Sequence, residues 1–188
     1  MLEPFPRLLA ELQKLSPSVQ GKCSEEWGAG TPSSRLWIRQ SLSASLPGLA
    51  PEEQAAITNL DMPPRPRAWS LSVSHTPGMG GWVAVLRDHQ IGWDVERKVR
   101  ISPNIIQRVC QADEVTGAPH GSFLWCAKES FFKALEDFQP LTLPELTITN
   151  WQSTGPDLWT WTGLGPRNGK GVLIDSEPWL LAGCLIVS

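Results

Sequence analysis

The first sixty residues have the apolar spacing of helices. One helix is predicted over residues 5–15 and another over residues 31–46, where Thr31 or Ser33 supplies an N-terminal cap. A third begins at Pro51, because a proline followed by two glutamates suits the first turn of a helix. The first third of the chain is therefore predicted to be mainly helical, with a glycine- and serine-rich loop after the first helix.

The pattern then changes to the alternation of strands. A proline-rich, basic segment must be extended or turning, and three strands with short turns follow it. Next come two helices separated by a loop, and then four strands with a hairpin signal, RNGKG, between two of them. The predicted ranges are 68–75, 82–88 and 89–95 for the first strands, 103–110 and 124–135 for the helices, and 146–148, 158–162, 171–175 and 180–187 for the last strands. Helices and antiparallel-looking strands in separate blocks predict an α+β fold.

Composition limits the class of the protein. The 188 residues are 41% hydrophobic, enough for one core or for two small halves that share one. A net charge of −3 argues against binding to nucleic acid or membranes by overall electrostatics. The four cysteines lie far apart, and the N-terminal segment has no basic region followed by an apolar run. We therefore expect reduced thiols, no signal peptide and a cytoplasmic location.

Tryptophan is unusually frequent. The chain has ten tryptophans and no tyrosine, and several cluster near the sequence LWTWT. They form either an aromatic stacking platform or part of the core and its rim. The alternation in LWTWT favours the core, because one face of such a strand is buried.

The helix over residues 124–135 carries charges among apolar neighbours. At about 100° per residue, Lys128 projects into an arc of leucine and aromatic side chains, and Glu129 and Lys133 lie along one border of that arc. An unpaired buried charge is costly. Either a bound ligand compensates these charges, or Lys128 extends its stem along the apolar face and reaches water.

Two carboxylates and a histidine mark the ends of predicted strands. Asp94 and Glu96 project from the same side of one strand, and paired oxygen ligands suit Mg²⁺ or Mn²⁺, although solvated acids at strand ends are common. Glu129 would complete a metal site if its helix crosses the end of that strand. Ser74 and His75 end another strand and could hold an anionic group, with an ordinary surface histidine as the alternative.

Together these segments resemble the 4′-phosphopantetheinyl transferases. The sequences SVSHTPG, IGWDVE and WCAKESFFKA stand in the order, and at about the separations, of that family's signatures. The motif in the helix is the most specific of the three. The resemblance covers residues 69–148 and is faint before Arg65.

The resemblance implies a reaction and a metal. Such enzymes move the phosphopantetheine arm of coenzyme A onto a serine of an acyl or peptidyl carrier protein and release 3′,5′-ADP. Asp94, Glu96 and Glu129 would ligate Mg²⁺, with Mn²⁺ as an alternative. Either Glu129 or a metal-bound water would take the serine proton, and the expected catalytic residues are Asp94, Glu129 and Lys133.

The resemblance also implies contacts to coenzyme A. Lys128 and Lys133 would neutralise the pyrophosphate, and His75, with Ser74, would contact the 3′-phosphate. Arg65 is a weaker match to a lysine that the family often has in this region.

The length of the chain resembles that of the larger, single-chain members of the family. This implies two similar halves, residues 1–84 and 85–188, related by a pseudo-twofold axis, in a monomer with coenzyme A between them. Arg35 and Arg39 are candidate phosphate contacts in the first half, but an ordinary solvated helix face is favoured. Trp93 replaces a small aliphatic residue of the family pattern and should point away from the two strand carboxylates.

The carrier is expected to dock on a basic segment, because carrier proteins are typically acidic. Residues 97–112 contain no acidic residue and four basic ones, which are Arg97, Lys98, Arg100 and Arg108. A solvated loop and helix face is the competing interpretation.

Two other functions stay open. A metal-dependent phosphodiesterase or nuclease could use the same three carboxylates with water, and a non-catalytic relative could bind coenzyme A or a carrier. The intact acidic triad and both lysines of the helix argue against a loss of activity.

Overall fold

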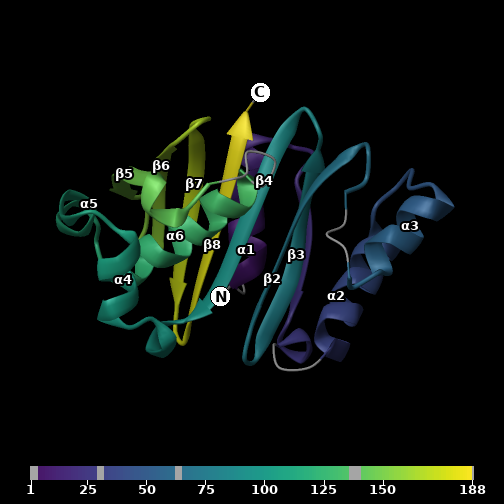
Figure 1. The fold of residues 1–188 in the computed structure, drawn as a ribbon, viewed down its shortest axis with the longest axis horizontal. Helices are drawn as coiled ribbons and strands as arrows, with labels where there is room; N and C mark the ends of the chain where they lie inside the picture. Colours follow the sequence, from purple (N-terminus) through teal and green to yellow (C-terminus); the bar gives the residue numbers. More distant parts are fainter. Residues whose placement is uncertain (1–3, 29–31, 62–64, 136–140, 188) are drawn as a thin grey trace.

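The chain forms two antiparallel sheets with helices around them, as a computed structural model describes for residues 4–28, 32–61, 65–135 and 141–187 (Figure 1). The α-helices in these ranges are α1 (Pro4–Leu15), α2 (Pro32–Ser45), α3 (Pro51–Thr58), α4 (Pro103–Val109), α5 (Ala112–Gly117) and α6 (Gly121–Ala134). The strands are β1 (Gln20–Ser24), β2 (Trp69–Thr76), β3 (Met79–Leu86), β4 (His89–Arg97), β5 (Thr147–Ser153), β6 (Leu158–Leu164), β7 (Gly169–Ser176) and β8 (Trp179–Val187). The predicted α+β class is confirmed. Within these ranges, no helix is both long and apolar enough to cross a membrane.

The strands are divided between two sheets. One has three strands in the order β1-β3-β2, and the other has five in the order β4-β8-β7-β6-β5. In the larger sheet β8 lies between β4 and β7, so the final strand is a central one.

Helices cover opposite faces of the five-stranded sheet. α6 packs on one face and α1 on the other, in front of and behind the sheet in Figure 1. Alternation along β4 sends Trp93 and Val95 into the core beneath α1. Trp93 is fully buried there, with its ring edge-on to Phe5 at a centroid distance of 5.3 Å. The prediction that Trp93 points away from the carboxylates is confirmed.

Serine side chains join the two sheets where β2 runs beside β4. β2 has a serine at every second position, and the hydroxyls of these serines accept hydrogen bonds from every second backbone N–H group of β4. The pairs are Ser70 with Ile91 at 3.2 Å, Ser72 with Trp93 at 3.0 Å and Ser74 with Val95 at 3.3 Å. These bonds satisfy N–H groups along an edge of β4 that no strand of its own sheet covers in the described part of the chain.

The far side of the three-stranded sheet is covered by α2 and α3. Ile38 of α2 and Ile57 of α3 pack with Trp69 and Trp82 in a third apolar cluster. α2 and α3 therefore form the end of the molecule opposite α4 and α5 (Figure 1).

Two elements occupy segments that were predicted as loops. β1 has the sequence QGKCS, which shows no apolar alternation, and its position depends on pairing with β3. α5 is a short polar helix whose start is capped by Glu114, which accepts a hydrogen bond from the Gln111 N–H at 2.9 Å. The predicted cap at Thr31 lies outside the described residues.

The tryptophans near the C-terminus belong to the core and its rim. Trp161 is buried, and Trp151 and Trp159 pack partly buried against the same cluster. This placement favours the interpretation as core residues over the aromatic platform.

Gly92 determines how closely α6 approaches β4. A Cβ atom at this position would overlap the carbonyl oxygen of Ser130 and would lie 2.5 Å from the amide nitrogen of Ala134. Both are backbone atoms of α6, so they cannot move aside as a flexible side chain can. The missing side chain therefore brings the charged border of α6 against the strand that carries Asp94.

We predict that Gly92→Ala lowers the free energy of unfolding by about 1–3 kcal/mol, because the methyl group overpacks the contact between helix and strand. Urea unfolding measures the change. Gly117→Ala is the matched control, since a Cβ at Gly117 meets nothing within 4 Å. Equal losses in the two variants would contradict a special role for the contact at Gly92.

Candidate active site

Asp94 lies at the centre of a polar cluster between β4, β2 and α6. Its side chain is 5% exposed. Oδ1 accepts a hydrogen bond from Lys133 Nζ at 2.6 Å and one from Ser74 Oγ at 2.8 Å. Oδ2 is buried and has no hydrogen-bond partner among the described residues. One oxygen of Asp94 is thus fixed, and the other is left for a ligand.

Glu96 and Glu129 add negative charge beside Asp94. Burial raises the pKa of the Glu96 carboxyl, and the charge of Asp94 raises it further. Burial likewise raises the pKa of Glu129, as do the charges of Asp94 and Glu96, against the opposing effect of Lys133. The charges of Asp94 and Glu96 on β4 thus act on Glu129 of α6, so the strand and the helix bring these carboxylates near one another.

Two side chains hold Glu96. Thr76 of β2 donates a hydrogen bond to Oε2 at 3.3 Å, and the Trp125 indole N–H approaches Oε1 at 3.5 Å. Thr76 also accepts a hydrogen bond from Arg100 at 3.2 Å. No sequence pattern pointed to Thr76, because its role depends on the alignment of β2 with β4.

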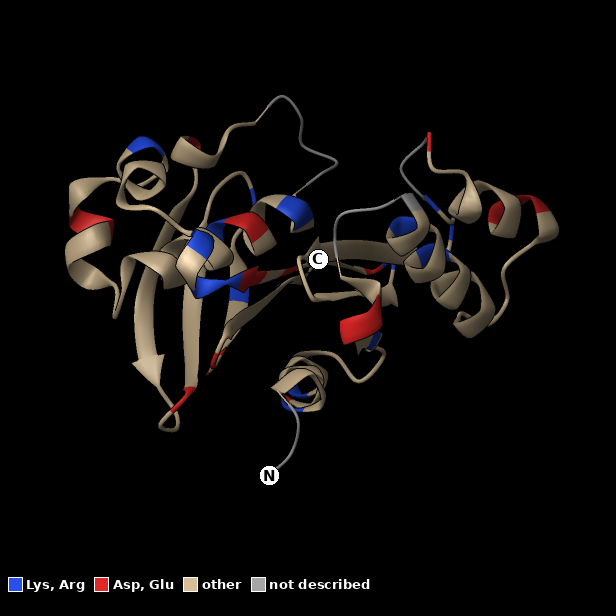
Figure 2. Ribbon diagram, turned by 90° about the horizontal axis from the view of Figure 1, so that it is seen from below, with Lys and Arg blue, Asp and Glu red and all other residues tan. Residues whose placement is uncertain are grey.

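Lys133 is the cation that faces the carboxylates. Its side chain is 28% exposed and reaches across from the last turn of α6. Burial lowers the pKa of Lys133, but the charge and hydrogen bond of Asp94, together with the charge of Glu129, raise it more. Lys133 therefore stays protonated at neutral pH. Figure 2 shows basic and acidic positions side by side on α6.

The donor chemistry of this cluster fits a Mg²⁺ ion. The groups are oxygen ligands, and the buried, unpartnered Oδ2 of Asp94 is the kind of atom that a cation would satisfy. Within the described ranges no three carboxylate, histidine or cysteine side chains are placed so that they could hold a metal ion by themselves. Mg²⁺ usually takes one or two carboxylates and completes its shell with water and substrate phosphates, so an incomplete protein set is compatible with it.

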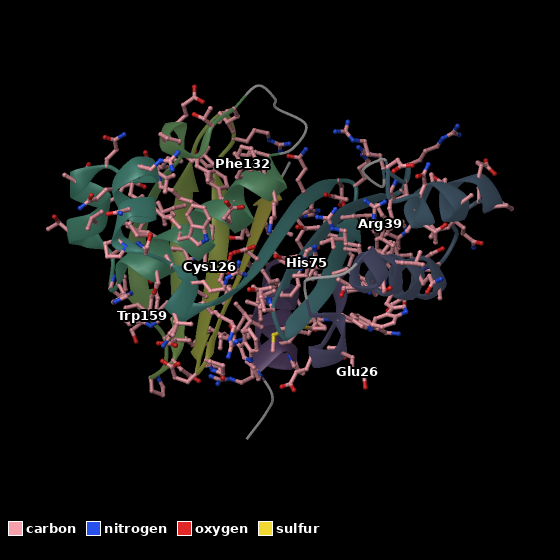
Figure 3. All side chains as sticks on the ribbon, turned by 60° about the horizontal axis from the view of Figure 1, so that its bottom comes forward. Glu26, Arg39, His75, Cys126, Phe132 and Trp159 are labelled. Carbon is pink, nitrogen blue, oxygen red and sulfur yellow. The ribbon has the colours of Figure 1, made fainter. Side chains whose placement is uncertain are left out.

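His75 lies between the motif helix and α2. In Figure 3 it is seen between the part of α6 marked by Phe132 and the helix that carries Arg39. Arg35 donates a hydrogen bond to His75 Nε2 at 3.3 Å, which requires the proton of a neutral ring to be on Nδ1. Nδ1 is buried and lacks a partner among the described residues. Burial lowers the pKa of His75, as do the charges of Arg35 and Lys133.

The cations around His75 make this side of the cluster suited to an anion. The sequence favoured a solvated face for Arg35 and Arg39, but Arg35 contacts His75, and Arg39 donates to the carbonyl oxygens of Ile57 and Asn59 at the end of α3. Arg35 thus joins the site and Arg39 supports a helix end. No sequence signal separated the two, since both roles depend on how α2 packs.

Lys128 does not face this cluster, and the prediction that it contacts pyrophosphate is contradicted. Its side chain is fully buried and forms an ion pair with Glu114 at 2.9 Å. Its ammonium also donates to the carbonyl oxygens of Leu143 and Leu146. The second Glu114 oxygen accepts from the Ile148 N–H at 2.8 Å. Glu114 of α5 therefore compensates the charge of Lys128. The helical pattern around Lys128 could not reveal this partner.

The remaining predicted residues lie around the cluster. Arg65 is exposed in the segment before β2. Lys98 pairs with Asp175 and Glu177, and the Arg97 guanidinium lies 5.3 Å from the ring centroid of Trp179. The exposed residues of the basic segment include Val99, Arg100 and Arg108.

The fold and this cluster define an α+β protein whose carboxylates and cations suit a phosphate-containing ligand. Residues 90–171 match the family model described as the 4′-phosphopantetheinyl transferase superfamily. This match confirms the resemblance predicted from the motifs, and it supports a transferase. It spans Asp94, Glu96 and the whole motif helix, while Ser74 and His75 precede it. A search of curated proteins gave no match.

We predict that Glu114→Ala destabilises the protein by about 3–5 kcal/mol, because it leaves the Lys128 charge buried without its partner. The double variant Glu114→Gln/Lys128→Met should recover much of that loss. Urea unfolding measures both, and calorimetry measures coenzyme A affinity. An unchanged affinity for coenzyme A in the folded double variant agrees with a structural role for Lys128. A marked loss of that affinity would mean that Lys128 contacts the ligand.

We predict that Glu129→Gln raises the thermal midpoint of the metal-free protein at pH 7. The native pKa of Glu129 is raised, so ionisation opposes folding above the unfolded value of about 4.3. The gain should therefore vanish as the pH falls below that value. Thermal unfolding in chelator between pH 3.5 and 8 tests this, and a lower midpoint for the variant at pH 7 would contradict it.

Proposed function

We propose that this protein transfers the 4′-phosphopantetheine arm of coenzyme A to a serine of an acyl or peptidyl carrier protein, releasing 3′,5′-ADP, with Mg²⁺ or Mn²⁺ bound. The observation that carries the proposal is the meeting of opposite charges at Asp94. Glu96 and Glu129 lie near enough to Asp94 for its charge to raise their pKa values, Lys133 pairs with Asp94, and Arg35 lies beside His75. This arrangement suits a ligand that combines a divalent cation with several phosphates.

Asp94, Glu96 and Glu129 would hold the metal, which supplies charge compensation for a pyrophosphate and for the oxygen that leaves it. Lys133 would bind the same pyrophosphate, since it is charged and partly exposed beside Asp94. Lys128 is not assigned to the pyrophosphate, because its ammonium already forms a buried ion pair with Glu114.

Glu129 is our candidate for the general base. Its carboxylate lies near Asp94 and Glu96, at the place where the incoming serine hydroxyl would meet the proposed metal site. In the proposed step the carrier serine oxygen attacks the phosphorus next to the pantetheine arm. Its proton passes to Glu129, and the bond to the oxygen of the leaving 3′,5′-ADP breaks.

His75 and Arg35 would bind the 3′-phosphate of coenzyme A. The Nδ1–H of His75 is a buried donor without an acceptor, and the Arg35 guanidinium lies next to the same ring. A phosphate would satisfy the donor and compensate the positive charges that lower the pKa of His75.

We also propose that the protein is a monomer with halves at residues 1–84 and 85–188. The two sheets follow this division closely, although α1 packs against the sheet of the second half. Coenzyme A would bind where β2 meets β4.

The carrier would dock beside the proposed site on the basic segment 97–112. Asp175 and Glu177 compensate the charge of Lys98, so the exposed Arg100 and Arg108 would supply the charge for an acidic carrier. Val99 is 86% exposed directly before Arg100 and would add an apolar contact.

The transfer itself is tested by intact mass spectrometry of an apo carrier protein incubated with coenzyme A and Mg²⁺. We expect the mass of one phosphopantetheine group to be added, and the addition to disappear without metal and in Asp94→Ala. Asp88→Ala, an exposed acid on the turn before β4, should behave like the wild type. Coenzyme A binding without any transfer to fatty-acid, polyketide or peptidyl carriers would favour the non-catalytic relative. Cleavage of a phosphodiester without a carrier would favour the phosphodiesterase.

We predict that Arg35→Ala and His75→Ala weaken coenzyme A binding on the order of tenfold, as expected for the loss of a charge-assisted contact. Both variants should bind 3′-dephospho-coenzyme A as the wild type does. Isothermal titration calorimetry measures the two ligands. An equal loss for both ligands would contradict the 3′-phosphate assignment.

We predict that Arg108→Glu raises the carrier KM on the order of tenfold at low salt and leaves the coenzyme A KM unchanged, because it reverses charge on the docking face. Lys22→Glu makes the same charge change on the exposed edge of β1 and is the control. Steady-state kinetics in both substrates measure the effect. A carrier KM that rises equally in both variants would reflect net charge only.

A further inference from the structure

Ser74 is almost fully buried where β2 meets β4, with 6% of its surface exposed. Its hydroxyl lies among three groups from two other elements. These are the side chain of Asp94 and the backbone of Val95 on β4, and the ammonium of Lys133 on α6.

The three hydrogen bonds use the whole capacity of this hydroxyl. A serine hydroxyl donates once and accepts twice. The Val95 N–H donates to Ser74 Oγ at 3.3 Å, and Lys133 Nζ donates to it at 3.1 Å. Both groups are obligatory donors, so the one hydroxyl proton goes to Asp94 Oδ1 at 2.8 Å. Ser74 therefore has no remaining donor for a phosphate.

We propose that Ser74 is a positioning residue, which holds Asp94 and Lys133 in place and does not itself contact coenzyme A. This replaces its predicted role as a ligand contact, and it rests on the proposed metal site. By fixing Oδ1, Ser74 and Lys133 set the rotation of the Asp94 carboxylate. The buried Oδ2 is thereby left as the atom that meets the cation.

Ser72 gives a matched comparison on the same strand. It is 5% exposed, and it accepts from the Trp93 N–H at 3.0 Å as Ser74 accepts from Val95. Among the described residues Ser72 bonds to no carboxylate or lysine; its hydroxyl donates to the Trp93 carbonyl oxygen at 3.5 Å. Removing either hydroxyl removes one bond between the sheets, but only Ser74→Ala releases Asp94.

The test compares Mn²⁺ binding by Ser74→Ala, Ser74→Thr and Ser72→Ala. The electron paramagnetic resonance signal of free Mn²⁺ is titrated with each protein, both with and without saturating coenzyme A. We expect Ser74→Ala to weaken Mn²⁺ binding about 10–100-fold, as the loss of a partner to a metal ligand does. Ser72→Ala should bind as the wild type does, and Ser74→Thr, which keeps the hydroxyl, should recover most of the affinity.

A second measurement separates positioning from direct contact. The ratio of affinities for coenzyme A and 3′-dephospho-coenzyme A should be the same in Ser74→Ala as in the wild type. A ratio that falls toward one would place Ser74 at the phosphate and overturn the proposal. Equal Mn²⁺ affinities in Ser74→Ala and Ser72→Ala, whether both are reduced or both are unchanged, would also overturn it.

The outcome is independent of the transfer reaction. If the wild type binds Mn²⁺ but modifies no carrier, the proposed function fails while the comparison of serines still decides the role of Ser74. If the wild type binds no Mn²⁺, the role of Ser74 in a metal site is overturned. Should Ser74→Ala not fold, Ser74→Cys, which donates and accepts weakly, is measured with the same criteria.

Discussion

A buried carboxylate on β4 needs a cation close by, and the ion pair of Asp94 with Lys133 meets that need. The pair lies between α6 and β4, and it is in reach because Gly92 lets the helix approach the strand. One lysine cannot compensate three carboxylates, however. Glu96 and Glu129 remain with raised pKa values, and Asp94 keeps an unpartnered oxygen. The packing of one helix thus creates a surplus of negative charge that favours a divalent cation.

These carboxylates face groups that the other sheet and its helix supply, namely the charge of Arg35 and the neutral ring of His75. His75 and Arg35 belong to β2 and α2, while the carboxylates belong to β4 and α6. The serine bonds between β2 and β4 hold these two sets in register. Because side chains and not a backbone ladder make the connection, the hydroxyls can bond to functional groups as well as to the strand edge. The junction of the sheets and the proposed site are therefore one structure.

Sequence patterns were sufficient for the helices and strands with clear periodicity, and for the alternation that separates Asp94 from Trp93. They failed for β1, whose polar residues are in a strand only because β3 pairs with them. They failed for Lys128 as well, since its partner Glu114 lies on a helix that the polar sequence did not reveal. A periodic pattern reports which face of an element is buried. It does not report which charged group from a distant segment arrives at that face.

The position of β8 has a consequence for how the molecule is made. β4 pairs with residues 179–187, about ninety positions later in the chain. The strand that carries Asp94 therefore cannot form this pairing until the later segment has been synthesised. Contacts between such distant segments form slowly, because the loop that joins them must close first. The edge of β4 that faces β8 therefore stays unpaired while residues 98–178 are made, next to the carboxylates of the proposed site.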